Sequence, residues 1–264
     1  MPSNFKVRTI SAIVYAIVVF SCLFTTKYAL IGFLSIVALF CVWEYVKITR
    51  LSITIALVLV LLIIALAVIR PDYLNQPAIL LLSCLYLAFM LFKLLVKLDL
   101  PVHSSMRAIT VALYILLPFA LLILSLFNET VYALMLPYFL FIWTADVGAY
   151  LVGRRFGKTP LYPAISPKKT WEGFFGAGIA VIMVAIIFHL TGNGHTALFW
   201  ILFGCIVWIF GAVGDLVESQ LKREHSIKDS SNLIPGHGGF LDRFDGFLFA
   251  IPFYLLLLST FDII

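Results

Sequence analysis

The sequence predicts an all-α integral membrane protein that crosses the bilayer about nine times. Hydrophobic residues make up 63% of the 264-residue chain, and only 12% of it is charged. A soluble domain carries about a quarter charged residues, because its surface faces water. The apolar residues also gather in long runs that short polar segments separate. Most of the chain is therefore expected to face lipid or other helices.

Each apolar run is expected to form one helix, since about 20 apolar residues cross the hydrocarbon core of a bilayer. The runs lie near 9–26, 28–43, 51–69, 78–93, 108–127, 131–152, 173–190, 197–217 and 244–261. They leave no room for a separate soluble domain. We divide the chain into an N-terminal scaffold region of about five helices, 1–130, and a C-terminal region of about four, 131–264, which the polar residues below mark as catalytic.

The positions of lysine and arginine predict the orientation of the chain. If the N-terminus is cytoplasmic, all of the 18 Lys and Arg residues except Lys27 and Arg70 fall in cytoplasmic segments. Cytoplasmic loops of membrane proteins are enriched in these residues. Nine crossings then place the C-terminus on the external side. The net charge of +5 follows from this sidedness and requires no nucleic-acid partner.

Charged residues are sparse before residue 140 and lie near the ends of the apolar runs. We interpret this half as scaffold and lipid-facing wall. Glu44 is the acidic residue of this half that is best placed to point inward, and we expect it to pair with Lys47 or Arg50 at the membrane interface. The four cysteines lie singly in apolar runs, so we expect them to pack rather than bind metal or form disulfides.

Polar residues become frequent after residue 140. Asp146 lies inside or at the end of an apolar run, where an ionisable group marks a functional site unless it only bonds a neighbouring helix. The segment 153–173 then combines five cations with Gly, Ser and Thr. Cations and backbone N–H groups at the start of a helix suit phosphate binding. Ser166, Lys168 and Lys169 stand directly before the next apolar run and are the candidates for that role.

The densest polar cluster begins at the end of the eighth apolar run. Asp215, Glu218, Ser219 and Lys222 are spaced by three or four residues. Residues with this spacing share one face of a helix. Because an apolar run precedes them, we expect this face to lie near the membrane surface and to border a hydrated pocket.

Two more carboxylates, Asp242 and Asp245, stand one helical turn apart at the start of the last run, with Arg243 between them. A helix N-terminus favours carboxylates, so capping explains one of them. Capping does not explain the second Asp, nor the Gly-His-Gly-Gly turn that precedes the pair. We expect His237 of this turn to contact the substrate rather than only to shape the turn.

Carboxylates that converge with several cations indicate phosphoryl or nucleotidyl transfer. Mg²⁺ takes few protein carboxylates and completes its shell with waters and phosphate oxygens, while Lys and Arg neutralise the remaining phosphate charge. Zn²⁺ is not expected, because the cluster offers oxygen ligands rather than Cys or grouped His. The sequence also lacks the G-x-x-x-x-G-K-[ST] loop of many nucleotide-binding proteins.

Several stretches of the C-terminal half resemble the motifs of the phosphatidate cytidylyltransferase (CDP-diacylglycerol synthase) family. The sequences SQLKR at 219–223, KD at 228–229 and PGHGGFLDRFD at 235–245 are together similar to the full family signature. The sequences DVGAY at 146–150 and SPKKTWEG at 166–173 are also similar to that family. The N-terminal half resembles the family only as a hydrophobic, multi-span region.

The resemblance implies transfer of CMP from CTP to phosphatidate, which yields CDP-diacylglycerol and pyrophosphate for phospholipid biosynthesis. It implies dependence on Mg²⁺, with room for a second cation, and an active site on the cytoplasmic face of a bacterial inner membrane. It also suggests a homodimer. Asp215 and Asp242 match the metal-binding carboxylates of the family. The catalytic candidates are Asp215, Asp242, Asp245, Lys222 and Arg223, and the substrate-binding candidates are Ser166, Lys168, Lys169, Ser219, Lys228, Asp229, His237, Arg243 and Asp146.

Two other classes of protein remain as alternatives at this point. A CTP-dependent lipid kinase of the polyprenol or phytol type would transfer a γ-phosphate to a lipid alcohol, but it should lack the continuous signature. An ion-coupled transporter should carry its carboxylates near mid-membrane on inverted-repeat helices. In this sequence the charges gather toward one face instead.

Overall fold

The structure is a computed structural model that describes residues 2–70, 77–96, 103–192 and 194–264. Its helices are α1 (Pro2–Thr25), α2 (Lys27–Thr49), α3 (Ile53–Ile69), α5 (Pro77–Val96), α6 (Ser104–Thr110), α7 (Leu117–Ser125), α8 (Glu129–Phe156), α9 (Trp171–Leu190), α10 (Ala197–Glu224) and α11 (Leu241–Thr260). A π-helical segment, η1 (Val111–Leu116), joins α6 to α7 in one continuous rod. The prediction of an all-α protein is confirmed.

Every predicted apolar run coincides with one of these helices or with the α6–η1–α7 rod. Within the described residues, six of the helical segments are long and apolar enough to cross a bilayer. The apolar part of α1 (Thr9–Thr25) and the whole of α3 are shorter. The protein is a polytopic membrane protein, whereas nine crossings and the orientation of the termini stay predictions.

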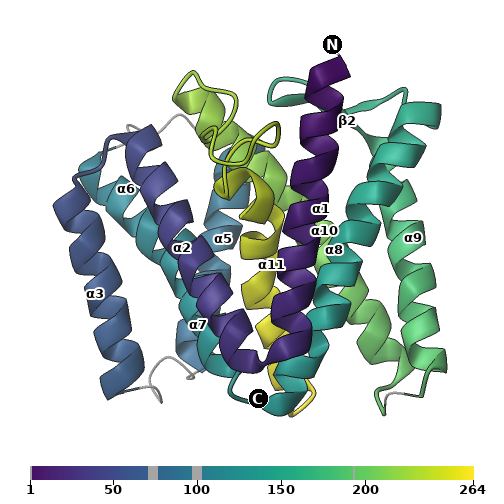
Figure 1. Ribbon diagram of the computed structural model, residues 1–264, viewed down its shortest axis with the longest axis horizontal. Coiled ribbons are helices and arrows are strands. Elements are labelled where there is room, and N and C mark those ends of the chain that lie inside the picture. The colour runs from purple at the N-terminus through teal and green to yellow at the C-terminus, as the bar shows by residue number, and fades with distance from the viewer. Residues whose placement is uncertain (1, 71–76, 97–102, 193) are drawn as a thin grey trace.

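Helix α11 occupies the middle of the bundle (Figure 1). It packs against α10 of the C-terminal region and against α2, α5 and α7 of the N-terminal region. Helices α8, α9 and α10 pack against one another on one side of the molecule. The division into two regions stays a prediction, and its boundary at residue 130 falls in the first turn of α8.

The outer faces of the bundle are apolar, as expected where lipid replaces water. In α3 only Ala56 is buried among described neighbours, although the helix is hydrophobic on all sides. Buried aromatic rings fill the interior between α8, α10 and α11. Tyr138 packs against Phe203 and Tyr254 and donates a hydrogen bond of 3.0 Å to the backbone oxygen of Phe247.

A short antiparallel hairpin, which the sequence analysis did not predict, joins α8 to α9. It consists of β1 (Pro160–Tyr162) and β2 (Ser166–Thr170), with Pro160 opposite Thr170. The side chain of Thr170 then caps α9 by accepting a hydrogen bond from the backbone N–H of Gly173. The hairpin therefore gives the cations before α9 a fixed position.

The two ends of the bundle differ in polarity. The hairpin, the start of α1 and the α10–α11 connection lie at one end, and the C-terminus lies at the other (Figure 1). Cations at the ends of α2, α8 and α10 belong to the first end, whereas Lys27 begins α2 and Arg70 follows α3 at the opposite end. Lys97, which the sequence analysis counted as cytoplasmic, lies outside the described residues.

Candidate active site

A cavity of about 480 Å³ lies between α8, α9, α10, α11 and the hairpin. Six of the residues that the sequence marked as site candidates line it: Asp146, Lys168, Lys169, Asp215, Arg243 and Asp245. Together with Arg154, which also lines it, three carboxylates and four cations therefore border one space at the polar end of an otherwise apolar bundle. Such a mixture suits a highly charged anionic ligand that binds together with a cation.

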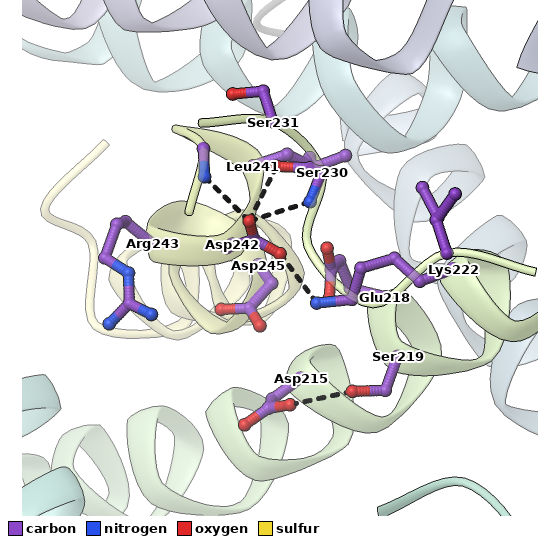
Figure 2. A network of polar contacts seen from close by, with 12 residues as sticks. Asp215, Glu218, Ser219, Lys222, Ser230, Ser231, Leu241, Asp242, Arg243 and Asp245 are labelled. Carbon is purple, nitrogen blue, oxygen red and sulfur yellow. Dashed lines mark hydrogen bonds and ion pairs between the residues drawn. The ribbon is translucent and has the colours of Figure 1, made fainter. Parts of the chain in front are cut away.

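Close contact between the backbones of α10 and α11 brings two of the carboxylates together. A Cβ atom on Gly214 would lie 2.6 Å from the backbone oxygen of Asp245, and one on Gly246 would lie 2.8 Å from that of Gly211. Only glycine fits at such distances. Because Asp215 and Asp245 adjoin these glycines, both carboxyl groups lie in the space between the two helices (Figure 2).

An ion pair ties the hairpin to α10. The Nζ atom of Lys169 lies 2.6 Å from Oδ2 of Asp215, and the Ser219 hydroxyl donates a hydrogen bond of 3.2 Å to Oδ1 of the same carboxylate. The side chains of Lys169 and Asp215 remain 27% and 42% exposed. Since both line the cavity, a ligand phosphate or a cation can reach them without unfolding the site.

Lys222 does not line the cavity but joins two buried carboxylates. Its Nζ atom lies 2.5 Å from Oε2 of Glu218 and 2.6 Å from Oδ1 of Asp242. The side chain of Glu218 is fully buried, and that of Asp242 is 5% exposed. Buried charges of this kind are tolerated only when they are paired, so Lys222 is required to hold α10 and the start of α11 together.

Asp242 is enclosed by hydrogen bonds in this structure (Figure 2). Besides the ion pair with Lys222, its Oδ2 atom accepts hydrogen bonds from the backbone N–H of Ser230 at 2.9 Å, the Ser230 hydroxyl at 2.8 Å and the backbone N–H of Gly239 at 2.7 Å. Asp242 thereby holds the α10–α11 connection against α11. Its predicted role as a metal ligand stays a prediction.

A second cavity, of about 310 Å³, lies beside the first and is formed by α1, α8, α11 and the α10–α11 connection. Its walls are mainly apolar and aromatic, with Tyr15 and Trp143 among them. Asp146 and Arg243 line both cavities and therefore stand between them. His237 also lines the second cavity, and its backbone oxygen accepts a hydrogen bond of 3.1 Å from Nε of Arg243.

Seven of the predicted site residues line neither cavity: Ser219, Lys222 and Asp242, whose contacts are given above, and Arg223, Lys228, Asp229 and Ser166. Arg223 donates a hydrogen bond of 3.1 Å to the backbone oxygen of Ile227 at the end of α10. Lys228 and Asp229 are exposed on the connection that follows. Ser166 begins β2 and pairs with Tyr162 across the hairpin. Their roles in substrate binding stay predictions.

The expectation for Glu44 is wrong. This residue of α2 is fully buried and does not pair with Lys47 or Arg50. Its carboxylate instead accepts hydrogen bonds from the α10–α11 connection and from the start of α11. An acidic residue in an apolar run was the available signal, but only the structure reveals a partner nearly 200 positions away.

The four cysteines are free; Cys41 and Cys84 are buried, and Cys22 and Cys205 are half-buried. Within the described part of the chain, no group of three His, Cys, Asp or Glu side chains is close enough to hold a metal ion alone.

The fold and the site together define a class: a polytopic membrane protein with a cavity at one end of its helices that carboxylates and cations line. Residues 6–261 match the family described as the Cytidylyltransferase family. Since this match covers nearly the whole chain, the protein belongs to that family. The match favours nucleotidyl transfer over the lipid-kinase and transporter alternatives.

Curated relatives carry the name phosphatidate cytidylyltransferase. The chain is 48% identical over 122 residues to the protein of that name from Bacillus subtilis (strain 168). It is 47% identical over 124 residues to the one from Staphylococcus aureus (strain COL). These alignments cover 46% of this chain and 45% and 46% of the two relatives, so the chain spans about half the length of the curated relatives it matches.

Proposed function

We propose that this protein is a nucleotidyltransferase that transfers CMP from CTP to phosphatidate and releases CDP-diacylglycerol and pyrophosphate. The observation that carries the proposal is the cavity in which Asp215 and Asp245 face Lys168, Lys169 and Arg243. The name of the curated relatives supports the same reaction.

The reaction places a specific demand on the site, because both reactants are anions. An oxygen of the phosphatidate phosphate attacks the α-phosphorus of CTP, and a new P–O bond forms. The bond from the α-phosphorus to the bridging oxygen breaks, and pyrophosphate leaves with the electron pair. A phosphomonoester is largely dianionic near neutral pH, so the nucleophile requires no protein base. The site must chiefly position the two phosphates and offset their repulsion.

The cations of the cavity are placed for these tasks. Lys168 and Lys169 lie on the hairpin and would bind the triphosphate of CTP, whose leaving pyrophosphate gains charge as the bond breaks. Binding would draw Lys169 from Asp215 toward the phosphates and free that carboxylate for a cation. Arg243 borders both cavities and would contact the phosphates of both substrates.

The second cavity suits the lipid substrate. Its apolar wall, which includes Phe139, Trp143 and Val147, would accept acyl chains, and Arg243 and His237 stand where a headgroup phosphate would lie. Because Asp146 and Arg243 belong to both cavities, the lipid phosphate and the nucleotide would meet at these residues. This arrangement explains why an enzyme for a lipid substrate requires a site enclosed by helices.

The residues present fit a magnesium ion. Asp215 and Asp245 line the cavity and would supply the oxygen ligands that Mg²⁺ prefers, whereas the family resemblance implies Asp215 and Asp242. A bound ion would stabilise the charge that develops on the transferred phosphate. Asp242, enclosed by Ser230 and Lys222, would support this pair by fixing the first turn of α11. A second cation remains part of the proposal, as the family resemblance implies.

We also propose that the cavity faces the cytoplasm of a bacterial inner membrane, since cations concentrate at that end of the bundle. CTP and pyrophosphate are cytoplasmic solutes, so a site on that face obtains one and releases the other without transport. A homodimer is proposed from the family resemblance alone.

The reaction is tested by incubating the purified protein with phosphatidate, Mg²⁺ and CTP that carries the label on the α-phosphate. We expect label in the lipid fraction, pyrophosphate in equal amount, and no transfer when EDTA is added. In a parallel incubation, CTP labelled on the γ-phosphate should leave the lipid unlabelled. Transfer of the γ-label to a lipid alcohol would contradict the proposal and support a lipid kinase.

A further inference from the structure

Glu44 is a buried carboxylate of α2 that accepts its hydrogen bonds from the α10–α11 connection and from the first residue of α11. Its Oε1 atom accepts hydrogen bonds from the Ser231 hydroxyl at 2.6 Å and the backbone N–H of Phe240 at 2.9 Å. Its Oε2 atom accepts from the Ser230 hydroxyl at 3.0 Å and the backbone N–H of Leu241 at 2.7 Å. A residue of the N-terminal half is thus bonded at three points to the connection that precedes α11 and at one point to the first residue of α11.

The placement of these donors explains how a buried carboxylate is stabilised here. The first N–H groups of a helix have no partner within the helix and carry a partial positive charge. Leu241 is the first residue of α11, and Phe240 directly precedes it. Glu44 therefore supplies from another helix the capping carboxylate that the first turn of α11 requires. An unpaired carboxylate at the same depth would be strongly unfavourable.

The same contacts connect Glu44 to the charged network of the site. The Ser230 hydroxyl lies 3.0 Å from Oε2 of Glu44 and 2.8 Å from Oδ2 of Asp242, so it can donate its single proton to either carboxylate. Asp242 in turn pairs with Lys222 of α10. A Cβ atom on Gly239 would collide with Glu44 and with Ser230, which explains why this position of the turn is glycine.

We propose that Glu44 is a positioning residue for the transfer reaction. It fixes the first turn of α11, and thereby directs Arg243, on that turn, and Asp245, at the start of the next, toward the cavity. This inference rests on the proposed function. It assigns to α2, in the half of the chain interpreted as scaffold, a direct part in shaping the active site.

The test is the variant Glu44→Gln. The glutamine amide keeps one acceptor oxygen, but its NH₂ group faces donors that the second carboxylate oxygen had accepted from. The α10–α11 connection and the start of α11 therefore lose some of their hydrogen bonds to α2. We expect kcat for CMP transfer to fall about 10- to 100-fold, because small displacements of reacting groups have effects of that size. The KM for CTP should rise by a smaller factor than kcat falls, because a displaced Arg243 would weaken one phosphate contact while Lys168 and Lys169 of the hairpin keep theirs.

Thr49→Val is the matched control. Thr49 lies on the same helix and is also buried. Its hydroxyl donates a hydrogen bond of 2.8 Å to the backbone oxygen of Tyr45 and none to the α10–α11 connection. This variant should keep the wild-type kcat. In hydrogen–deuterium exchange, the amides of Phe240 and Leu241 should exchange faster in Glu44→Gln than in the wild type. In Thr49→Val their exchange rates should equal those of the wild type.

A Glu44→Gln protein with the kcat and the amide exchange of the control overturns the inference. If that variant does not fold, Ser231→Ala removes one of the four bonds and should lower kcat about threefold and speed exchange at Phe240. Wild-type values in Ser231→Ala would then overturn it. If the wild-type protein transfers no CMP, the proposed function fails, while exchange at Phe240 and Leu241 still decides whether Glu44 holds the connection.

Discussion

Asp215, Asp242 and Asp245 share one chemistry but differ in their surroundings. Asp215 is accessible in the cavity and pairs with Lys169. Asp245 also lines the cavity, one turn after Asp242. Asp242 is nearly inaccessible and is held by Lys222 and by donors of the preceding connection. In this structure Asp215 and Asp245 are therefore accessible from the cavity, whereas the bonding capacity of Asp242 is taken up by protein donors.

Replacement by asparagine distinguishes these two kinds of carboxylate. In Asp215→Asn and Asp245→Asn we expect the rate of CMP transfer to fall about 100-fold or more, because a charge that stabilises the transition state is lost. Their thermal unfolding in detergent should resemble that of the wild type. In Asp242→Asn we expect both the rate of CMP transfer and the thermal stability to fall. The loss of stability should be about 3 kcal/mol, since the buried charge of Lys222 loses a partner.

Initial rates and circular dichroism melting curves measure the two effects separately. A wild-type rate in Asp215→Asn or Asp245→Asn would remove these residues from the reaction. An unchanged melting curve in Asp242→Asn would show that this carboxylate is dispensable for the α10–α11 connection.

At the level of elements, the sequence predicts the helices well because each one is a local pattern. An apolar run long enough to cross a bilayer becomes a helix whatever its neighbours are, since its backbone must bond internally in lipid. The hairpin β1–β2 was not predicted because its strands have only three and five residues and show no alternation of apolar and polar side chains. In the structure, contacts with α9 and α10 hold the hairpin: Thr170 accepts a hydrogen bond from Gly173, and Lys169 pairs with Asp215. The residues of the hairpin alone do not reveal these partners.

The site is predicted from the sequence only in part, because many of its contacts join residues that are far apart in the chain. Asp215 and Lys169 could be recognised by their residue type and by the motifs around them, and the structure places them in one cavity. Their pairing with each other could not be foreseen, nor could the enclosure of Asp242. The contacts of Glu44 join residues 186 to 197 positions apart, which no single sequence reveals.

The crossing of α10 and α11 provides a test at this scale. In Gly246→Ala the new Cβ would meet the backbone of Gly211, so the two helices must separate and Asp245 must move away from Asp215. We expect at least about a tenfold loss of transfer rate. Gly32→Ala is the control, because a Cβ on this glycine of α2 would touch nothing within 4 Å.

Rates of CMP transfer in detergent compare the two alanine variants under the same conditions. The control should match the wild type. Equal activity in Gly246→Ala would mean that close approach of the backbones is not what positions the carboxylates.

For the whole molecule, the bundle is apolar along its sides and charged at one end. Both cavities open among the helices near that end, which also holds the hairpin and the α10–α11 connection (Figure 1). The C-terminus lies at the opposite end. An enzyme that joins a water-soluble nucleotide to a membrane lipid requires this polarity, since its two substrates arrive through different media.

Sealed membrane vesicles of opposite orientation test this account most directly. CTP does not cross a bilayer, so α-labelled CTP added outside reaches only one face of the protein. We predict that inverted vesicles, which expose the cytoplasmic face, incorporate label into lipid, and that right-side-out vesicles do so only after they are permeabilised. Incorporation by sealed right-side-out vesicles alone, or by neither preparation after permeabilisation, would contradict the account.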